Sequence, residues 1–252
     1  MLKLLSILKT IPEYSLLLKG LENNQSAAIT GIGQINRSHL IAGLYKDCGA
    51  PVVVLCQDDM AAKRLQEELK AFLGISFPAL PNRELTMYDT AVVSRGWEQK
   101  RLRQLYDLAV GKTGLQIMSW EAMSQRTIPK QTLLAAAFSL EVGAEYDINR
   151  LITQLTGSGY ARCGMVEGPG QFAVRGGILD VYSPAADLPI RAEFFGDELD
   201  TMGYFDPATQ RRTENVEKVV ILPVGETQPR LHKGGLDGLC GDLKHQIGRA
   251  HV

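Results

Sequence analysis

The hydrophobic pattern of the first half of the chain alternates between short apolar runs and segments of helical periodicity. Apolar runs occupy residues 27–29, 51–55 and 115–118. Helical spacing covers residues 37–45, a segment from Asp58 or Asp59 to Gly74, and a segment ending at Gly111. This alternation predicts an α/β domain with a mainly parallel sheet and helices on its faces, beginning with a β-α-β unit over residues 27–55.

After about residue 125 the pattern changes to one helix followed by short strands. Residues 147–156 have helical spacing, and strands are expected at 171–175, 178–182, 190–195, 198–204 and 216–224. Gly176-Gly177 and Gly196-Asp197 separate successive strands, and glycine is the residue that takes positive φ in tight turns without strain. We therefore expect an antiparallel α+β module.

Length and composition agree with two domains. The chain has 252 residues, of which 45% are apolar and 22% charged. We place the domains at residues 1–125 and 126–225 and expect residues 226–245 to begin a further, truncated segment. The last seven residues, 246–252, can be encoded by DNA that resembles a common sequencing adapter, so native sequence is expected to end near Gln246.

The two parts of the chain differ in net charge. Residues 1–137 carry 16 Lys and Arg and 12 Asp and Glu, a net charge of +4, whereas residues 138–225 carry 7 and 13, a net charge of −6. An acidic surface repels nucleic-acid phosphates, so the second part is expected to meet a protein.

The sequence gives no sign of a membrane segment or a metal site. No run approaches the roughly 20 apolar residues of a membrane span, and Lys9, Pro12 and Glu13 interrupt the N-terminal apolar stretch. The four cysteines lack zinc-ligand spacing and the histidines are scattered. We expect a cytoplasmic protein with reduced thiols, no membrane association, no metal or other cofactor and no catalytic residues.

The stretch TGIGQINRS, residues 30–38, resembles a phosphate-binding loop. With Gly31 in the first position of G-x-x-x-x-G-K-[ST], Asn36, Arg37 and Ser38 fill the last three. Asn36 replaces the glycine that lets backbone amides wrap a phosphate, and Arg37 replaces the compact lysine ammonium. The sequence therefore predicts a degenerate loop that joins strand to helix.

A dinucleotide-binding loop is the alternative interpretation. Gly31, Gly33 and Asn36 approximate G-x-G-x-x-G, and Asp58 or Asp59 follows the next strand where a ribose-binding acid could stand. The alternative function is a nucleotide- or NAD-binding α/β enzyme that uses the loop from Gly31 to Ser38.

Two arginines stand out in the second part. Alternation along residues 171–175 directs Phe172 and Val174 to one face and Arg175 outward. If residues 160–163 form the neighbouring strand, Arg162 joins Arg175 in a positive patch suited to carboxylates on a protein partner. Alternatively, each arginine pairs with an acid of its own module, such as Glu193 or Asp200.

Residues 159–184, GYARCGMVEGPGQFAVRGGILDVYSP, and 188–211, LPIRAEFFGDELDTMGYFDPATQR, carry a family resemblance. They resemble the N-terminal module of bacterial transcription-repair coupling factors (the Mfd family), which is similar to the excision-repair protein UvrB. The motifs VRGGILDVY, FFGDELD and FDPATQR occur in the family's order, and the resemblance covers residues 1 to about 245.

The resemblance implies a helicase-like (RecA-like) domain that has lost its nucleotide site, followed by a UvrA-interaction domain. It implies that Arg162 and Arg175 contact UvrA, and that Ala173 stands where UvrB has a further arginine. The family's RNA polymerase-binding domain and its ATP- and Mg-dependent motor on double-stranded DNA lie outside these residues. The expected function is non-catalytic recruitment of UvrA to stalled RNA polymerase in transcription-coupled nucleotide excision repair.

Overall fold

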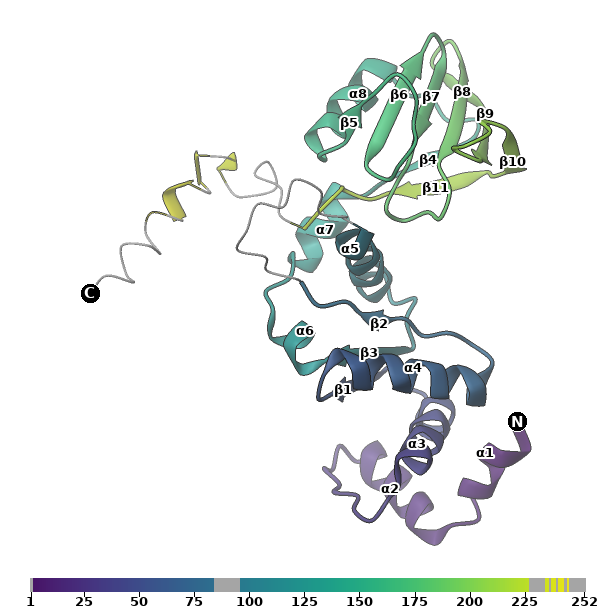
Figure 1. The fold of residues 1–252 in the computed structure, drawn as a ribbon, viewed down its shortest axis with the longest axis vertical. Coiled ribbons are helices and arrows are strands. Elements are labelled where there is room, and N and C mark those ends of the chain that lie inside the picture. The colour runs from purple at the N-terminus through teal and green to yellow at the C-terminus, as the bar shows by residue number, and fades with distance from the viewer. Residues whose placement is uncertain are drawn as a thin grey trace. The chain divides into compact units, whose positions relative to one another are not determined.

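The computed structural model describes residues 2–83 and 96–226, together with residues 234–235, 237–238, 240–242 and 244 (Figure 1). The chain packs as two compact units, residues 1–89 with 110–126 and residues 90–109 with 127–252. The predicted tail, 246–252, and most of the predicted segment 226–245 lie outside the described residues. Within the described part, no helix has the length and apolar character that crossing a membrane requires.

The first unit contains a three-stranded parallel sheet. Its strands are β1 (Val52–Cys56), β2 (Ala79–Leu80) and β3 (Leu115–Ser119), in the order β1-β3-β2, which confirms the predicted parallel pairing. Its helices are α1 (Leu2–Leu8), α2 (Pro12–Glu22), α3 (Gln34–Asp47), α4 (Asp59–Leu73) and α6 (Trp120–Ser124). The predicted cap of α4 is present: the Asp58 carboxylate accepts a hydrogen bond from the Ala61 amide at 2.7 Å, and Gly74 ends the helix with φ of 71°.

The predicted first strand, at residues 27–29, is wrong. These residues form no regular element, and all three are exposed. Two of the three are alanines, which have low β propensity, and Gly31 turns the chain with φ of 75° directly after them. The sheet is also less covered than predicted, because Val53 and Leu55 alternate to a face on which they stay 59% and 46% exposed.

The second unit is built around a six-stranded sheet in the order β10-β9-β8-β7-β6-β5. These strands are β5 (Ala161–Arg162), β6 (Gln171–Arg175), β7 (Ile178–Val181), β8 (Ile190–Phe195), β9 (Glu198–Phe205) and β10 (Arg212–Asn215). All neighbours are antiparallel except β5 and β6. A separate antiparallel pair joins β4 (Phe138–Glu141) to β11 (Lys218–Ile221). The predicted hairpins are confirmed, whereas β4 and β10 had no recognisable pattern.

The two faces of the six-stranded sheet differ in character. One face contributes Phe172, Leu179 and Ala192 to the main core, which also contains Leu151 and Leu155 of α8 (Ile148–Gly157). The predicted helix at 147–156 is thereby confirmed, with Asp147 as its N-cap. The opposite face carries a small apolar cluster of Val166, Ala173 and Phe205, and it holds the charged residues described below.

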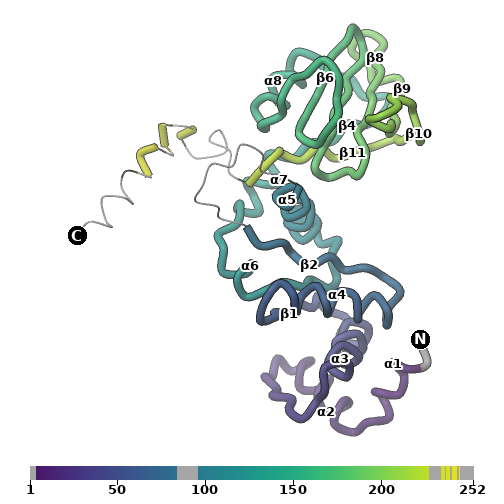
Figure 2. Tube along the Cα trace, in the orientation of Figure 1, coloured from purple at the N-terminus to yellow at the C-terminus, as the bar shows by residue number. Residues whose placement is uncertain are grey.

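Helix α5 (Gly96–Ala109) packs in the second unit, although the predicted boundary at residue 125 assigned it to the first domain. Its Leu102 and Leu105 share an apolar cluster with Leu133 of α7 (Lys130–Ala136) and with Leu222. Helices α5 and α7 lie side by side (Figure 2). Apolar spacing predicts which face of a helix is buried, but it does not identify the neighbour.

A buried ion pair fixes α5 to the end of the second unit. The Arg101 guanidinium donates from Nε to Glu226 at 2.7 Å, and both side chains are fully buried. Glu226 also accepts a hydrogen bond from the Ile128 amide at 3.3 Å. One carboxylate therefore joins three segments that are far apart in sequence.

Replacing Arg101 with methionine should lower the free energy of unfolding by about 3–5 kcal/mol, because the ion pair would be lost while the Glu226 carboxylate stayed buried. The matched control is Arg103→Met on the same helix. Arg103 pairs with Asp187 at 2.6 Å, but that pair is exposed, so the loss should stay below about 1 kcal/mol. Urea unfolding of both variants checks this, and equal losses would contradict it.

Candidate functional site

The degenerate nucleotide loop forms the entrance to α3. Gly31 has φ of 75°, and Gly33 is the N-cap residue, so Asn36, Arg37 and Ser38 lie in the first turns of the helix. The Arg37 side chain folds back and donates from Nε to the Ile32 carbonyl at 3.2 Å. Its guanidinium is therefore engaged with the loop's own backbone.

Glu68 of α4 places a carboxylate beside this loop. The Ser38 hydroxyl, which is 1% exposed, donates a hydrogen bond to Glu68, and Gln34 donates to the same carboxylate at 3.4 Å. In a phosphate-binding loop the equivalent hydroxyl faces Mg²⁺. In this chain the Ser38 hydroxyl is bonded to the Glu68 carboxylate instead, and the negative charge of that carboxylate repels phosphate.

The register of the β5–β6 edge separates the two predicted arginines. Arg162 pairs with Phe172, whose side chain lies in the main core, so alternation places Arg162 on the core face of the sheet. Arg175 lies three residues beyond Phe172 on β6 and therefore on the opposite face. Both residues are exposed. They share an edge of the sheet but not the single patch that the sequence suggested.

The two arginines also differ in their partners. In the part of the chain that the structure describes, Arg162 forms no ion pair. Arg175 keeps a side chain that is 51% exposed and donates to Asp180 at 2.8 Å. The intramodular pairing considered for Arg175 is thus present, but its partner is Asp180, while Glu193 pairs with Arg212 at 3.2 Å.

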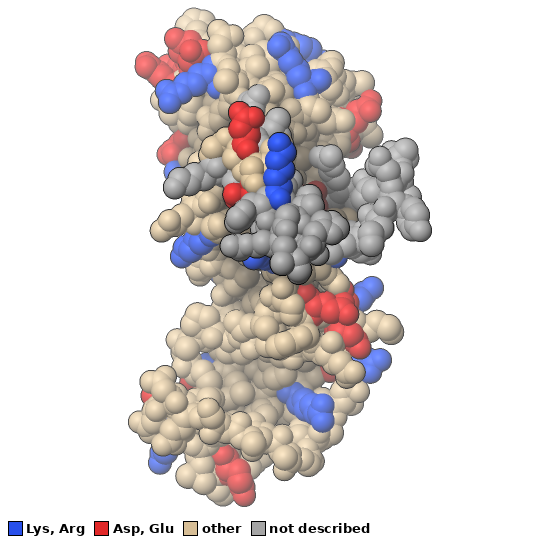
Figure 3. All heavy atoms as spheres, turned by 90° about the vertical axis from the view of Figure 1, so that its left-hand side faces the viewer, with Lys and Arg blue, Asp and Glu red and all other residues tan. Residues whose placement is uncertain are grey.

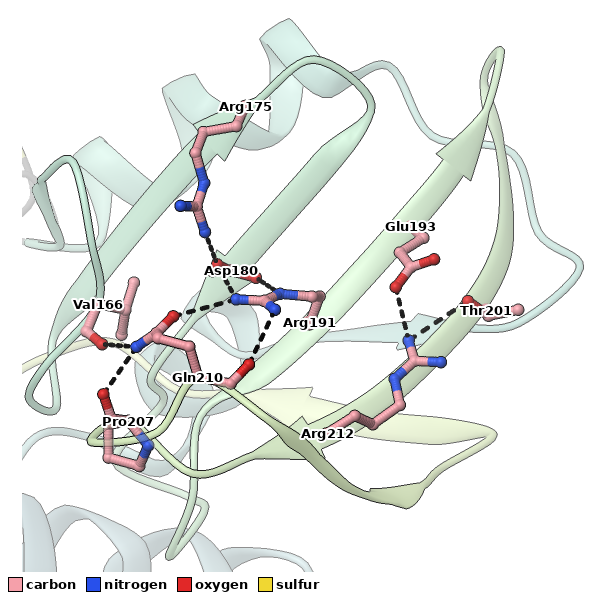
Figure 4. Close-up of polar contacts among 9 residues, drawn as sticks. All are labelled: Val166, Arg175, Asp180, Arg191, Glu193, Thr201, Pro207, Gln210 and Arg212. Atoms are coloured by element: carbon pink, nitrogen blue, oxygen red, sulfur yellow. Dashed lines mark hydrogen bonds and ion pairs between the residues drawn. The ribbon is translucent and has the colours of Figure 1, made fainter.

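Asp180 is the centre of the polar network on this face (Figure 4). It lies on β7, between β6 and β8, and its side chain is only 1% exposed. Arg191 on β8 donates hydrogen bonds to both oxygens of the carboxylate, at 2.7 and 2.9 Å. This hydrogen bonding raises the pKa of Arg191. The Arg191 guanidinium also lies over the Phe205 ring, 4.5 Å from its centroid.

Gln210 closes the network on its other side. Its carbonyl and its side-chain oxygen accept hydrogen bonds from Arg191 at 3.2 and 3.1 Å. The side-chain nitrogen donates to the Val166 and Pro207 carbonyls (Figure 4). Gln210 has φ of 59°, a conformation that costs about 1 kcal/mol or more and persists here because several bonds hold it. The network therefore fixes the loops that contain Val166 and Pro207.

The structure also explains what sequence reasoning missed. Asp180 and Arg191 alternate outward on their strands, but their pairing depends on the β7–β8 register, which the sequence does not reveal. Ala173 is 1% exposed within the cluster of Val166 and Phe205. An arginine at this position would have to displace that cluster.

In the upper part of Figure 3, which shows one side of the second unit, Lys and Arg side chains are interspersed with Asp and Glu side chains. A broad basic surface is the usual requirement for binding a phosphate backbone. Among the described residues, this side of the second unit shows no broad basic surface.

The second unit contains a match to a known domain family. Residues 138–226 match the UvrB interaction domain family, so the sheet and its polar network lie within a domain of this kind. Over most of its length the chain is similar to transcription-repair-coupling factors, which confirms the resemblance predicted from its motifs. Identity to the protein of Myxococcus xanthus is 32% over 224 residues, and identity to that of Escherichia coli K12 is 30% over 213 residues.

The alignments cover 83% and 84% of this chain but only 19% and 18% of those two relatives. A protein of Staphylococcus aureus with the same name is 28% identical over 199 residues. The chain therefore spans about a fifth of the length of the curated relatives it matches. Activities of the whole relatives do not transfer to this segment by similarity alone.

Replacing Asp180 with asparagine should lower the free energy of unfolding by about 2 kcal/mol, because Arg191 and Arg175 would lose a charged acceptor. Asp200→Asn is the control, since Asp200 is exposed and forms no ion pair among the described residues. Its effect should stay within about 0.5 kcal/mol. Thermal unfolding compares the two, and an unchanged Asp180→Asn protein would contradict the role of this carboxylate.

Proposed function

We propose that this chain is a non-catalytic recruitment module that binds UvrA in transcription-coupled nucleotide excision repair. The observation that carries the proposal is the match of residues 138–226 to the UvrB interaction domain. Two exposed arginines at one edge of that domain's sheet support it, because guanidinium groups form bidentate contacts with carboxylates.

The proposed contact straddles the β5–β6 edge. Strand β5 is two residues long, and Arg162 and Arg175 project from opposite faces at this edge. A partner that reached both arginines would wrap the edge, with Arg162 on one side and Arg175 on the other. The pairing with Asp180 would hold Arg175 in one orientation and so reduce the entropy lost on binding.

Other functions of the longer protein would depend on segments outside this chain. By analogy with the relatives' name, we propose that such a protein couples repair to transcription, with RNA polymerase and double-stranded DNA as partners of its other domains. ATP and Mg²⁺ would serve a motor located there. In this chain the Gly31–Ser38 loop would have only a structural role.

Binding to purified UvrA tests the proposal. Arg162→Glu and Arg175→Glu should each weaken binding roughly tenfold or more, since each replaces an attractive charge with a repulsive one. Arg211→Glu is the charge-matched control, because Arg211 is exposed and directly precedes β10, at the opposite edge of the sheet from β5. Equal affinity of all three variants and the unmodified chain would reject the site assignment.

Calorimetry with ATP and with NAD separates the proposal from the alternative enzyme. We expect no saturable heat from either nucleotide, because Glu68 sets a negative charge beside the loop and Arg37 is bonded to Ile32. A phosphate-binding-loop ATPase titrated under the same conditions serves as the positive control. Saturable binding to this chain would favour the enzyme.

A further inference from the structure

Phe195, the last residue of β8, exposes more of its side chain than any other large hydrophobic residue that the structure describes. It is 85% exposed. Aromatic residues are enriched at the centres of protein interfaces, where their large area is removed from water. If this ring lies on the same face as Arg175, one partner could contact both side chains.

Strand register places Phe195 on the same face as Arg175. Phe194 pairs with Leu199, which is fully buried in the main core, so alternation turns Phe195 to the opposite face. Arg175 pairs with Ile178, and Ile178 pairs with Glu193, two residues before Phe195 on β8. All of these positions belong to the face that carries the Asp180 network.

The two side chains also lie at the same end of the sheet. The turn after Arg175 and the turn after Phe195 are side by side, as the tops of β6–β7 and β8–β9 show (Figure 1). Gly177 accepts a hydrogen bond from the Phe194 amide at 2.7 Å. A Cβ atom at Gly177 would lie 2.8 Å from the Phe194 carbonyl oxygen, so glycine is what permits this approach.

The backbone on both sides of Phe195 is fixed by its neighbours. Its neighbour Phe194 packs edge-on against Tyr146, with ring centroids 6.4 Å apart, and Gly196 completes the turn with φ of 65°. A fixed backbone reduces the conformational entropy that is lost when a partner buries the side chain it carries.

Acidic residues lie close to Phe195 in the sequence and in the strand register. Asp197 and Glu198 follow Phe195 and Gly196 in the turn, and the backbone of Glu145 forms an antiparallel β-bridge with that of Glu198. All three are exposed, and within residues 2–83 and 96–226 none forms an ion pair. The surface is therefore an apolar centre with a negatively charged rim.

We infer that Phe195 is a second anchor for the partner that Arg175 contacts, filling an apolar pocket lined at its rim by lysine or arginine. The inference rests on the proposed function, because it concerns the same partner. It adds a contact that extends the binding surface from the β5–β6 edge to the β8–β9 turn. Asp197 and Glu198 would then contact the basic rim of the partner's pocket, while Arg175 would contact a carboxylate of the partner.

The test measures the Kd of the full 252-residue chain for purified UvrA. Phe195→Ala should raise Kd roughly tenfold or more while leaving the unfolding midpoint unchanged, because the ring is exposed in the free chain. Leu134→Ala is the matched control. Leu134 is an exposed apolar residue of α7 in the same unit, and its removal should leave Kd unchanged.

A second variant tests the charge of the pocket rim. Glu198→Lys should also raise Kd, whereas tighter binding would overturn the basic rim. An unchanged Kd for Phe195→Ala, with Arg175→Glu still weakened, would overturn the inference and leave the proposed function standing. No binding by the unmodified chain would overturn both.

Discussion

The second unit depends on the charge balance of one buried carboxylate, that of Asp180. A carboxylate inside a sheet needs positively charged partners within hydrogen-bonding distance. Arg191 meets this need with two hydrogen bonds, and Arg175 adds a third from the neighbouring strand. Isolated burial of such a charge would cost several kcal/mol. Three features agree with this need to pair Asp180 with Arg191. They are the register of the strands, the position of the Arg191 guanidinium over Phe205 and the positive φ of Gln210.

The same interaction links the interior of the unit to its surface. Arg191 is mostly buried and completes the charge balance, whereas Arg175 reaches Asp180 while half of its side chain stays in water. One arginine therefore serves stability, and the other combines a fixed orientation with an accessible charge. A guanidinium held in this way is better prepared for recognition than one on an unrestrained side chain.

Much of the fold could be predicted from sequence because its signals are local. The Asp58 cap, the glycine at 74 and the turn glycines at 176 and 196 each act within a few residues. The errors were of a different kind. Residues 27–29 are apolar but form no strand, α5 packs away from its sequence neighbours, and Asp180 is matched to Arg191 only through register. These features depend on distant partners, which apolar spacing does not specify.

The Arg101–Glu226 pair has a consequence for the limits of the folded unit. The region that matches the UvrB interaction domain begins at residue 138, yet Glu226 at its far end is satisfied by Arg101 and by the Ile128 amide, both upstream of that start. A version trimmed to residues 138–226 would expose the apolar surface that α5 covers and would lack the Arg101 guanidinium that pairs with Glu226. The compact second unit therefore includes α5, which lies upstream of the recognisable homology.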